Sequence, residues 1–205
     1  PHVQTVRMDI DTTRERDAHA KLLGKFGRGE AQVLIGTQMI AKGLDFPNIT
    51  LVGVLSADTM LHLPDFRASE KTFQLLTQVS GRAGRHILPG EVVIQTYTPE
   101  HYSIVLASKQ HYEDFYAREM FMRRQGMYPP YYYVTLITVS HEDLMKVISV
   151  TEKITNFIKG GLSGEAIILG PAASPIPRIN NRYRYQCLIK YKREPELQDR
   201  LKKVI

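Results

Sequence analysis

Two short, nearly unbroken apolar runs most constrain the fold of this chain: AQVLIG at residues 31–36 and ITLVGVLSA at residues 49–57. Runs of this length suit strands that are buried on both faces, as in a parallel sheet covered by helices. The patterns around them predict strands over residues 3–10 and 90–97 and helices over residues 12–26, 69–80 and 98–125. Strands that alternate with helices in this order indicate an α/β layer with a mostly parallel sheet.

The composition changes at GMYPPYYY, residues 126–133. The two prolines cannot continue a helix, and the tyrosines favour a strand. We therefore expect one domain over residues 1–126 and a second over residues 127–205. The second has the pattern of a small α+β unit with an antiparallel sheet: strands over 131–140, 166–170 and 182–192, helices over 142–159 and 195–205, and a proline-broken loop over 171–181. The pattern also suggests a piece cut from a longer protein, truncated before a last strand.

The strand RYRYQCLIKYK alternates strictly, which predicts one buried face and one basic outer face. The expected buried face holds Tyr183, Tyr185, Cys187, Ile189 and Tyr191. The expected outer face holds Arg182, Arg184, Gln186, Leu188, Lys190 and Lys192.

Composition restricts the function classes. The 205 residues carry a net charge of +6, which favours polyanionic partners, although a merely solvated basic surface is an equal alternative. A single cysteine, Cys187, excludes a disulfide scaffold or a multi-cysteine metal site within these residues. No apolar run approaches the roughly 18 residues of a membrane helix, and no segment has the pattern of a signal peptide. We expect a cytoplasmic protein without a membrane partner.

Several catalytic motifs are absent or incomplete. No G-x-x-x-x-G-K-[ST] sequence occurs, because the Gly24–Lys25 pair is followed by Phe26. HEDLM lacks the second histidine of a zinc-protease helix, and GLSGE has Glu165 where a nucleophile elbow needs glycine. The chain therefore shows neither a self-contained active site nor a metal site.

The segment QVSGRAGR, residues 78–85, calls for a different explanation. An arginine can be supplied to a phosphate from outside the main nucleotide pocket, and its planar guanidinium matches phosphate oxygens. Gly81 and Gly84 would let the backbone turn and approach a ligand closely, while Arg82 and Arg85 would project on one side. Gln78 lies one helical turn before Arg82. The alternative is a plain basic helix end.

A second motif precedes it, GTQMIAKGLDFPNITLVGVLSAD at residues 36–58. The two together, in this order, resemble motifs V and VI of superfamily 2 helicases. GTQMIAKGLDFP followed by DTMLHLPDFRASEKTFQLLTQVSGRAGR resembles the PriA family of bacterial replication-restart DNA helicases in particular. The resemblance covers nearly the whole chain, including YPPYYY and PIPRINNRYRYQ.

The resemblance implies that residues 1–126 form the second of two RecA-like lobes. ATP with Mg would bind between this lobe and a first lobe that these residues do not contain. Arg82 and Arg85 would then be arginine fingers on the γ-phosphate, and Gln78 would couple the ATP site to DNA. Asp45 would bind the ribose, and Gly43 would let the main chain approach the nucleotide. The alternative for Asp45 is a turn formed with the proline that follows.

The same resemblance places DNA contacts on both domains. Thr37 and Lys42 would bind DNA phosphates, with an exposed loop lysine as the alternative for Lys42. The second domain would bind forked or single-stranded DNA through Arg178, Arg182, Arg184, Lys190 and Lys192. A basic face that is only solvated, or docked on the lobes, stays open. For the tyrosines at 131–133, packing at the domain junction, which we favour, and a stacking platform also stay open.

Taken as a whole, the chain resembles the C-terminal part of an ATP-dependent DNA helicase for replication restart and primosome assembly. In the full-length protein, the family implies a zinc module outside these residues. Its expected partners are single-stranded-DNA-binding protein and primosome loading proteins. The alternatives are a non-catalytic nucleic-acid-binding module and another superfamily 2 motor that acts on RNA.

Overall fold

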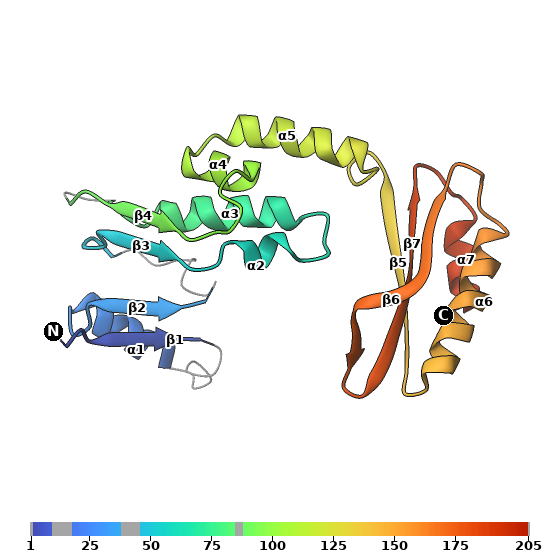
Figure 1. The fold of residues 1–205 in the computed structure, drawn as a ribbon, viewed down its shortest axis with the longest axis horizontal. Coiled ribbons are helices and arrows are strands. Elements are labelled where there is room, and N and C mark those ends of the chain that lie inside the picture. The colour runs from blue at the N-terminus through green and yellow to red at the C-terminus, as the bar shows by residue number, and fades with distance from the viewer. Residues whose placement is uncertain (1, 10–17, 38–45, 85–87, 205) are drawn as a thin grey trace. The chain divides into compact units, whose positions relative to one another are not determined.

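The computed structural model describes residues 2–9, 18–37, 46–84 and 88–204 (Figure 1). The chain divides into two compact units, residues 1–117 and 118–205, and each is described by itself. Lys42, Gly43, Asp45 and Arg85 lie outside the described residues, as does the expected start of the first helix.

Two parallel strand pairs form the sheets of the first unit (Figure 1). β1 (Thr5–Met8) pairs with β2 (Val33–Gly36), and β3 (Leu51–Val54) pairs with β4 (Glu91–Ile94). Among the described residues no ladder joins the two pairs. Helices separate the paired strands in sequence, as parallel pairing requires. The α/β class expected from the sequence is confirmed.

Helices cover one face of the β3–β4 pair. They are α2 (Asp58–Leu61), α3 (Ala68–Ser80), α4 (Tyr102–Ser108) and the start of α5 (Tyr112–Gln125), while α1 (Ala18–Gly27) contacts β1. The core beneath them is formed by Ala57, Phe73, Leu76, Ile104, Ala107 and Phe115. The rings of Phe73 and Phe115 stack with centroids 4.0 Å apart.

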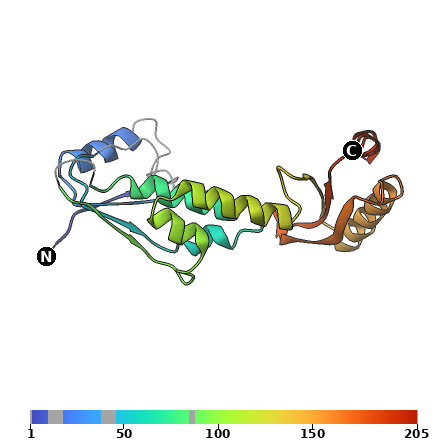
Figure 2. The same ribbon diagram turned by 90° about the horizontal axis from the view of Figure 1, so that it is seen from above.

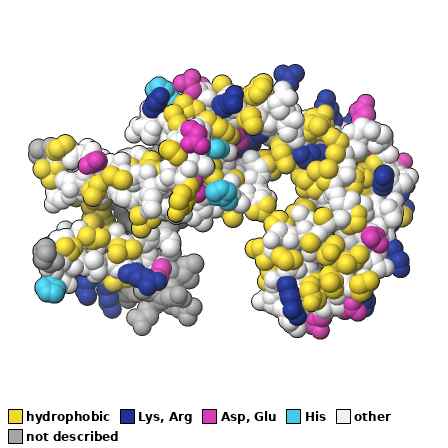
Figure 3. Space-filling model, viewed as in Figure 1, with side chains coloured by type: hydrophobic (Ala, Val, Ile, Leu, Met, Phe, Trp, Pro, Cys, Tyr) yellow, Lys and Arg dark blue, Asp and Glu magenta, His cyan; other side chains and the backbone are white. Residues whose placement is uncertain are grey.

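The expected burial of the apolar strands on both faces was wrong for the described residues. Val54 packs on the core, but Leu51 in the same strand is 60% exposed, and Ile35 of the other apolar run is 50% exposed. Helices cover a single face of the β3–β4 pair, so alternate side chains point to solvent. Figure 3 shows hydrophobic side chains on the surface of each unit.

The single helix expected over residues 98–125 is two helices, α4 and α5. Gln110 lies between them with φ +55°, a left-handed conformation that ends an α-helix. His101 caps α4, since its Nδ1 accepts a hydrogen bond from the Ser103 amide. Thr98, three residues earlier, donates its hydroxyl to Asp58.

The second unit contains a three-stranded antiparallel sheet in the order β5-β7-β6, formed by β5 (Tyr133–His141), β7 (Arg182–Tyr191) and β6 (Ile167–Ile179). Helices α6 (Leu144–Lys159) and α7 (Leu197–Val204) lie on one face of this sheet (Figures 1 and 2). Asp143 caps α6 by accepting a hydrogen bond from the Lys146 amide, 3.2 Å away.

The core of this unit consists of Ile158, Cys187, Ile189 and Leu197, each at most 2% exposed. The buried face expected for β7 is confirmed at Cys187 and Ile189. Burial raises the pKa of the Cys187 thiol, which disfavours the reactive thiolate. Cys187 is therefore a packing residue.

The expected proline-broken loop at 171–181 is largely part of β6. The strand breaks register with β7 between Leu169 and Ala172 and again between Ala173 and Arg178. β6 is an edge strand and pairs on one side only, so an amide donor that a proline lacks does not have to leave a gap in the ladder. This explains why the prolines are tolerated. Gly170 has φ +106°, and a Cβ there would lie 2.7 Å from the Gln186 carbonyl oxygen.

No helix in the described part of the chain is long and apolar enough to cross a membrane.

The fold predicts a stability difference between two isoleucines of the second unit. Ile189 is 0% exposed and Ile176 is 59% exposed. Ile189→Ala should lower the free energy of unfolding by about 2–5 kcal/mol because it leaves a cavity in the core. Ile176→Ala should change it by less than about 0.5 kcal/mol. Urea denaturation of both variants checks this, and equal losses would contradict the core as described.

Candidate functional site

The end of α3 carries two of the residues expected at the nucleotide. Gln78 lies in its last turn, and the chain continues past Ser80 in turn conformation. The Gly81 amide donates to the Thr77 carbonyl at 3.2 Å, and the Arg82 amide donates to the Val79 carbonyl at 3.0 Å. Gln78 and Arg82 are both half-buried. The structure therefore brings these two residues together on one helix end.

The second glycine of this motif fastens the loop to the sheet. Gly84 has φ +68°, and a Cβ there would lie 2.7 Å from the Gly90 nitrogen. Its amide donates to the Ile49 carbonyl at 3.2 Å. Ile49 lies two residues before β3 and Gly90 immediately before β4, so the loop that carries Arg82 lies at the amino-terminal edge of this strand pair.

The two glycines thus differ in their roles. Gly81 has an ordinary helix-end φ of −72°, and a Cβ there would meet nothing closer than 3.7 Å. Gly84 has both the positive φ and the close backbone approach that only glycine permits. The approach seen here is to Gly90, and an approach to a ligand stays a prediction.

Thr37, expected to bind a DNA phosphate, directly follows β2 and is exposed. Its neighbour in the motif, Lys42, and the nucleotide residues Gly43, Asp45 and Arg85 lie outside the described residues. The structure consequently places Thr37, Gln78 and Arg82, but does not test the arrangement of the whole site.

Three arginines gather around the β6–β7 hairpin. Its turn is Asn180–Asn181, with φ +49° and +63°, as in two-residue turns that match the twist of paired strands. Arg178 donates to the side chain of Asn181, and its guanidinium lies 4.8 Å from the centre of the Tyr183 ring. The Arg182 guanidinium donates to the Ser140 carbonyl at 2.9 Å. Arg178 and Arg182 are exposed, and Arg184 is half-buried.

Lys190 does not lie on an exposed basic face, so that expectation was wrong. It is 7% exposed, and its Nζ donates to the Gly126 carbonyl at 2.7 Å. The ammonium also lies 3.6 Å from the centre of the Tyr128 ring. The segment before β5 covers this end of β7 and replaces water around the charge. Lys192 is exposed, 5.2 Å from the Tyr132 ring.

A buried ion pair holds the same segment from the helix side. Arg123 donates to Glu119 at 2.8 Å, and the two side chains are only 11% and 4% exposed. Arg123 also donates to the Pro129 carbonyl at 3.4 Å. The prolines and tyrosines after α5 are therefore fixed by a carboxylate–guanidinium pair as well as by Lys190.

Asp58, a buried acidic residue of the first unit, was not expected from the sequence to have a special role. It is 4% exposed, and its carboxylate accepts hydrogen bonds from the Thr96 hydroxyl (2.9 Å), the Thr98 hydroxyl (2.8 Å) and the Tyr97 amide (3.0 Å). Burial opposes ionisation, but the bonds from Thr98, Tyr97 and Thr96 outweigh it and lower the pKa of Asp58 to about 2. The signal in the sequence was a charged residue directly after the apolar run at residues 49–57.

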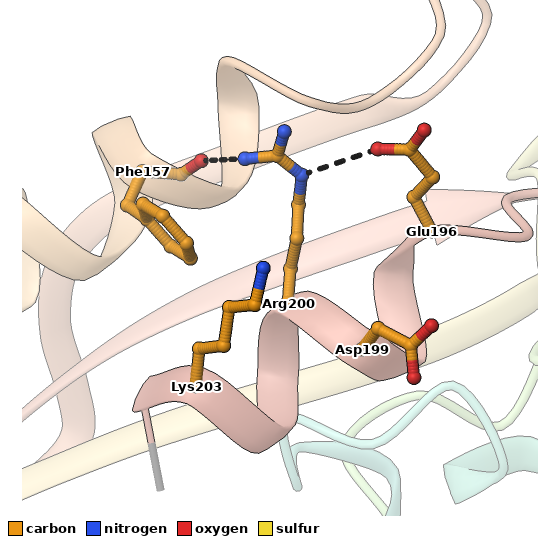
Figure 4. Close-up of a pocket in the computed structure, with 5 residues that line it drawn as sticks. All are labelled: Phe157, Glu196, Asp199, Arg200 and Lys203. Atoms are coloured by element: carbon orange, nitrogen blue, oxygen red, sulfur yellow. Dashed lines mark hydrogen bonds and ion pairs between the residues drawn. The ribbon is translucent and has the colours of Figure 1, made fainter.

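A surface pocket between α6 and α7 is a weaker candidate (Figure 4). Its lining includes Phe157 and Arg200, and the guanidinium donates to the Phe157 carbonyl at 2.9 Å. Glu196 pairs with the same side chain at 3.6 Å. Arg200 thus fastens α7 to α6. Within the described residues, no group of three or more His, Cys, Asp or Glu side chains could hold a metal ion.

Two family models match the chain. Residues 2–87 match the model of the helicase conserved C-terminal domain, and residues 124–205 match that of the primosomal protein N C-terminal domain. The domain boundary at residue 126 stays a prediction.

Individual relatives agree with the models. The chain is 62% identical over 205 residues to a protein of Bacillus subtilis named replication restart protein PriA, covering 100% of this chain and 26% of the relative. The protein of the same name from Synechocystis is 46% identical over 191 residues, 93% of this chain and 23% of the relative. The protein of the same name from Haemophilus influenzae is 35% identical over 204 residues, which cover 98% of this chain and 28% of the relative. The chain spans about a quarter of the length of these relatives.

The hydrogen bonds of Asp58 predict how the stability of the first unit depends on pH. The pKa is lowered from 3.8 to about 2, so the stabilisation is present above about pH 4 and is lost as pH falls towards 2. Asp58→Asn should remove this part of the acid dependence, because a side-chain amide does not ionise between pH 6 and pH 2, and its NH₂ group cannot accept the hydrogen bonds that one carboxylate oxygen accepts now. It should also lower Tm at neutral pH.

Thermal denaturation of the wild type and Asp58→Asn between pH 6 and pH 2 measures the difference. Glu91→Gln, which changes an exposed carboxylate at the start of β4, is the control and should retain the wild-type profile. Parallel profiles for the wild type and Asp58→Asn would contradict the assignment.

Proposed function

Because the chain belongs to the PriA family of replication restart proteins, whose C-terminal part it matches, we propose that it forms the second motor lobe and the C-terminal domain of an ATP-dependent DNA helicase. The observation that carries the proposal is the helix end that holds Gln78 and Arg82, in a segment that matches the helicase C-terminal model. The full activity requires a first lobe, so this chain supplies part of a shared site.

Arg82 and Arg85 are proposed as the groups that reach the transferred phosphate. Charge on that phosphate spreads over its oxygens in the transition state, and a guanidinium fork stabilises it through paired hydrogen bonds. The contact of Gly84 with Gly90 supports this role, since it anchors the loop to the strand pair and limits its freedom. Gln78, in the last turn of α3 and four residues before Arg82, would sense any movement of Arg82.

The family resemblance implies further groups on the nucleotide side of the site. Asp45 and Gly43 would accommodate the ribose and the close approach of the main chain. Magnesium, when bound, neutralises charge on the phosphates, and its ligands are expected on the first lobe. The zinc module of the full-length protein is likewise expected outside these residues.

DNA would be held mainly through its phosphates, which makes movement along it independent of sequence. Thr37 and Lys42 are the proposed contacts of the lobe. In the C-terminal domain we retain Arg178, Arg182, Arg184 and Lys192, and we omit Lys190 because its ammonium is buried and already hydrogen-bonded.

ATP binding and hydrolysis would alternately favour a closed and an open arrangement of the two lobes, and so move the strand. As parts of the same proposal, the protein is cytoplasmic and meets single-stranded-DNA-binding protein and primosome loading proteins at stalled forks. The alternatives of an RNA motor or a pure scaffold have no specific observation in their favour.

One prediction of the proposed function concerns the arginine finger. In the full-length protein, Arg85→Ala should lower kcat for DNA-stimulated ATP hydrolysis by about 10³-fold or more while ATP binding is largely kept. Steady-state hydrolysis and equilibrium binding of a fluorescent ATP analogue separate the two effects. Arg7→Ala, at an exposed arginine of β1, is the control. A change in kcat of less than about threefold would count against the assignment.

Another prediction of the proposed function concerns the ATP site that the two lobes would share. The isolated 205-residue chain should hydrolyse no ATP above background, with or without DNA, because the groups that cradle the phosphates are expected on the other lobe. A phosphate-release assay tests this. Substantial DNA-stimulated hydrolysis by the isolated chain would refute a site divided between two lobes.

A further inference from the structure

Tyr133 has an unusual environment for the first residue of a sheet strand. It lies opposite Tyr191 in the ladder between β5 and β7, yet it is 65% exposed. The two rings stack with centroids 5.6 Å apart and planes inclined by 27°. Tyr191 in turn packs against the core of the unit. Tyr133 therefore rests on a supported ring and keeps most of its own surface accessible.

The position of this ring is fixed before any partner arrives. Tyr133 belongs to a strand, and the segment before it is held by the Tyr131 amide, which donates to the Tyr128 carbonyl at 3.0 Å. Lys190 and Arg123 bind the same segment at the carbonyls of Gly126 and Pro129. A rigid aromatic side chain loses little conformational entropy when a ligand stacks on it.

Positive charge lies beside the residue that precedes Tyr133. Lys192 is exposed and lies 5.2 Å from the ring of Tyr132, the residue before Tyr133. Arg193 is also exposed, and Tyr131 is 41% exposed. The carboxylate that follows, Glu194, accepts hydrogen bonds from Ser163. Accessible rings beside exposed cations are the combination that binds single-stranded nucleic acid, in which rings stack on bases and cations neutralise phosphates.

We propose that Tyr133, supported by Tyr191, is a stacking platform for an unpaired base of single-stranded DNA, and that Lys192 binds a neighbouring phosphate. The inference rests on the proposed function and specifies where the C-terminal domain holds the strand. Within the second unit, Tyr128 is used in packing because it lies against the buried Lys190, whereas Tyr133 is 65% exposed.

The absence of tryptophan from the chain allows a direct test. Tyr133→Trp in the full 205-residue chain introduces a unique fluorophore at the platform. Adding an oligothymidine single strand should quench its fluorescence with the same midpoint as binding measured by anisotropy of the labelled oligonucleotide. Tyr97→Trp places the fluorophore at a residue that is 89% exposed in the first unit, and it should not be quenched.

Affinity measurements separate stacking from charge. Tyr133→Ala should weaken binding of the oligothymidine by about 5- to 100-fold without changing the salt dependence, because no phosphate contact is lost. Tyr133→Phe keeps the ring and should stay within about twofold of the wild type. Lys192→Ala should lower the slope of log affinity against log salt by about one. Melting temperatures of all variants establish that they are folded.

The outcomes are distinct. If the chain binds the oligothymidine but the tryptophan at 133 is unquenched and Tyr133→Ala binds normally, the platform is overturned while the proposed DNA binding stands. If the chain binds no single-stranded DNA at low salt, both are overturned. Quenching together with the loss on Tyr133→Ala and its recovery with phenylalanine supports the platform.

Discussion

The contact between the backbones of Gly84 and Gly90 is the constraint on which the position of the loop that carries Arg82 depends. A Cβ on Gly90 would lie 2.2 Å from the Gly84 nitrogen, so neither position has room for a side chain. The contact joins the turn after α3 to the residue before β4, and the Gly84 amide also donates a hydrogen bond to the carbonyl of Ile49, two residues before β3. Arg82 thereby takes its position from the sheet, and the chemistry proposed for it requires such positional accuracy.

In the second unit, the residues that are used in packing differ from those that are exposed. Tyr128 and Lys190 are used in packing, as are the Arg123–Glu119 pair and Tyr191. Tyr133 and Lys192 lie outside this packed group and are accessible. The YPPYYY segment thus contains both structural and exposed rings, which explains why composition alone did not decide between junction packing and a stacking platform.

Sequence patterns predicted most elements because apolar periodicity reports directly which face of an element is covered. The patterns failed where the burial or the structure of a residue depends on a segment that is distant in the sequence. Strict alternation placed Lys190 outside, but it contained no information on the segment that folds over that end of β7. The prolines of β6 suggested a loop, because strand order, which makes β6 an edge, is not a local property. Asp58 was missed since its three donors lie 38 to 40 residues away.

The edge position of β6 has a consequence for self-association. An exposed edge strand is a template for pairing with another chain, and proline blocks it by removing amide donors. β6 carries Pro171, Pro175 and Pro177, whereas β5, at the opposite edge, has none between Tyr133 and His141. Among the described strands of this sheet, the outer edge of β6 is therefore the one at which proline opposes pairing with a further strand, and the outer edge of β5 has no such block.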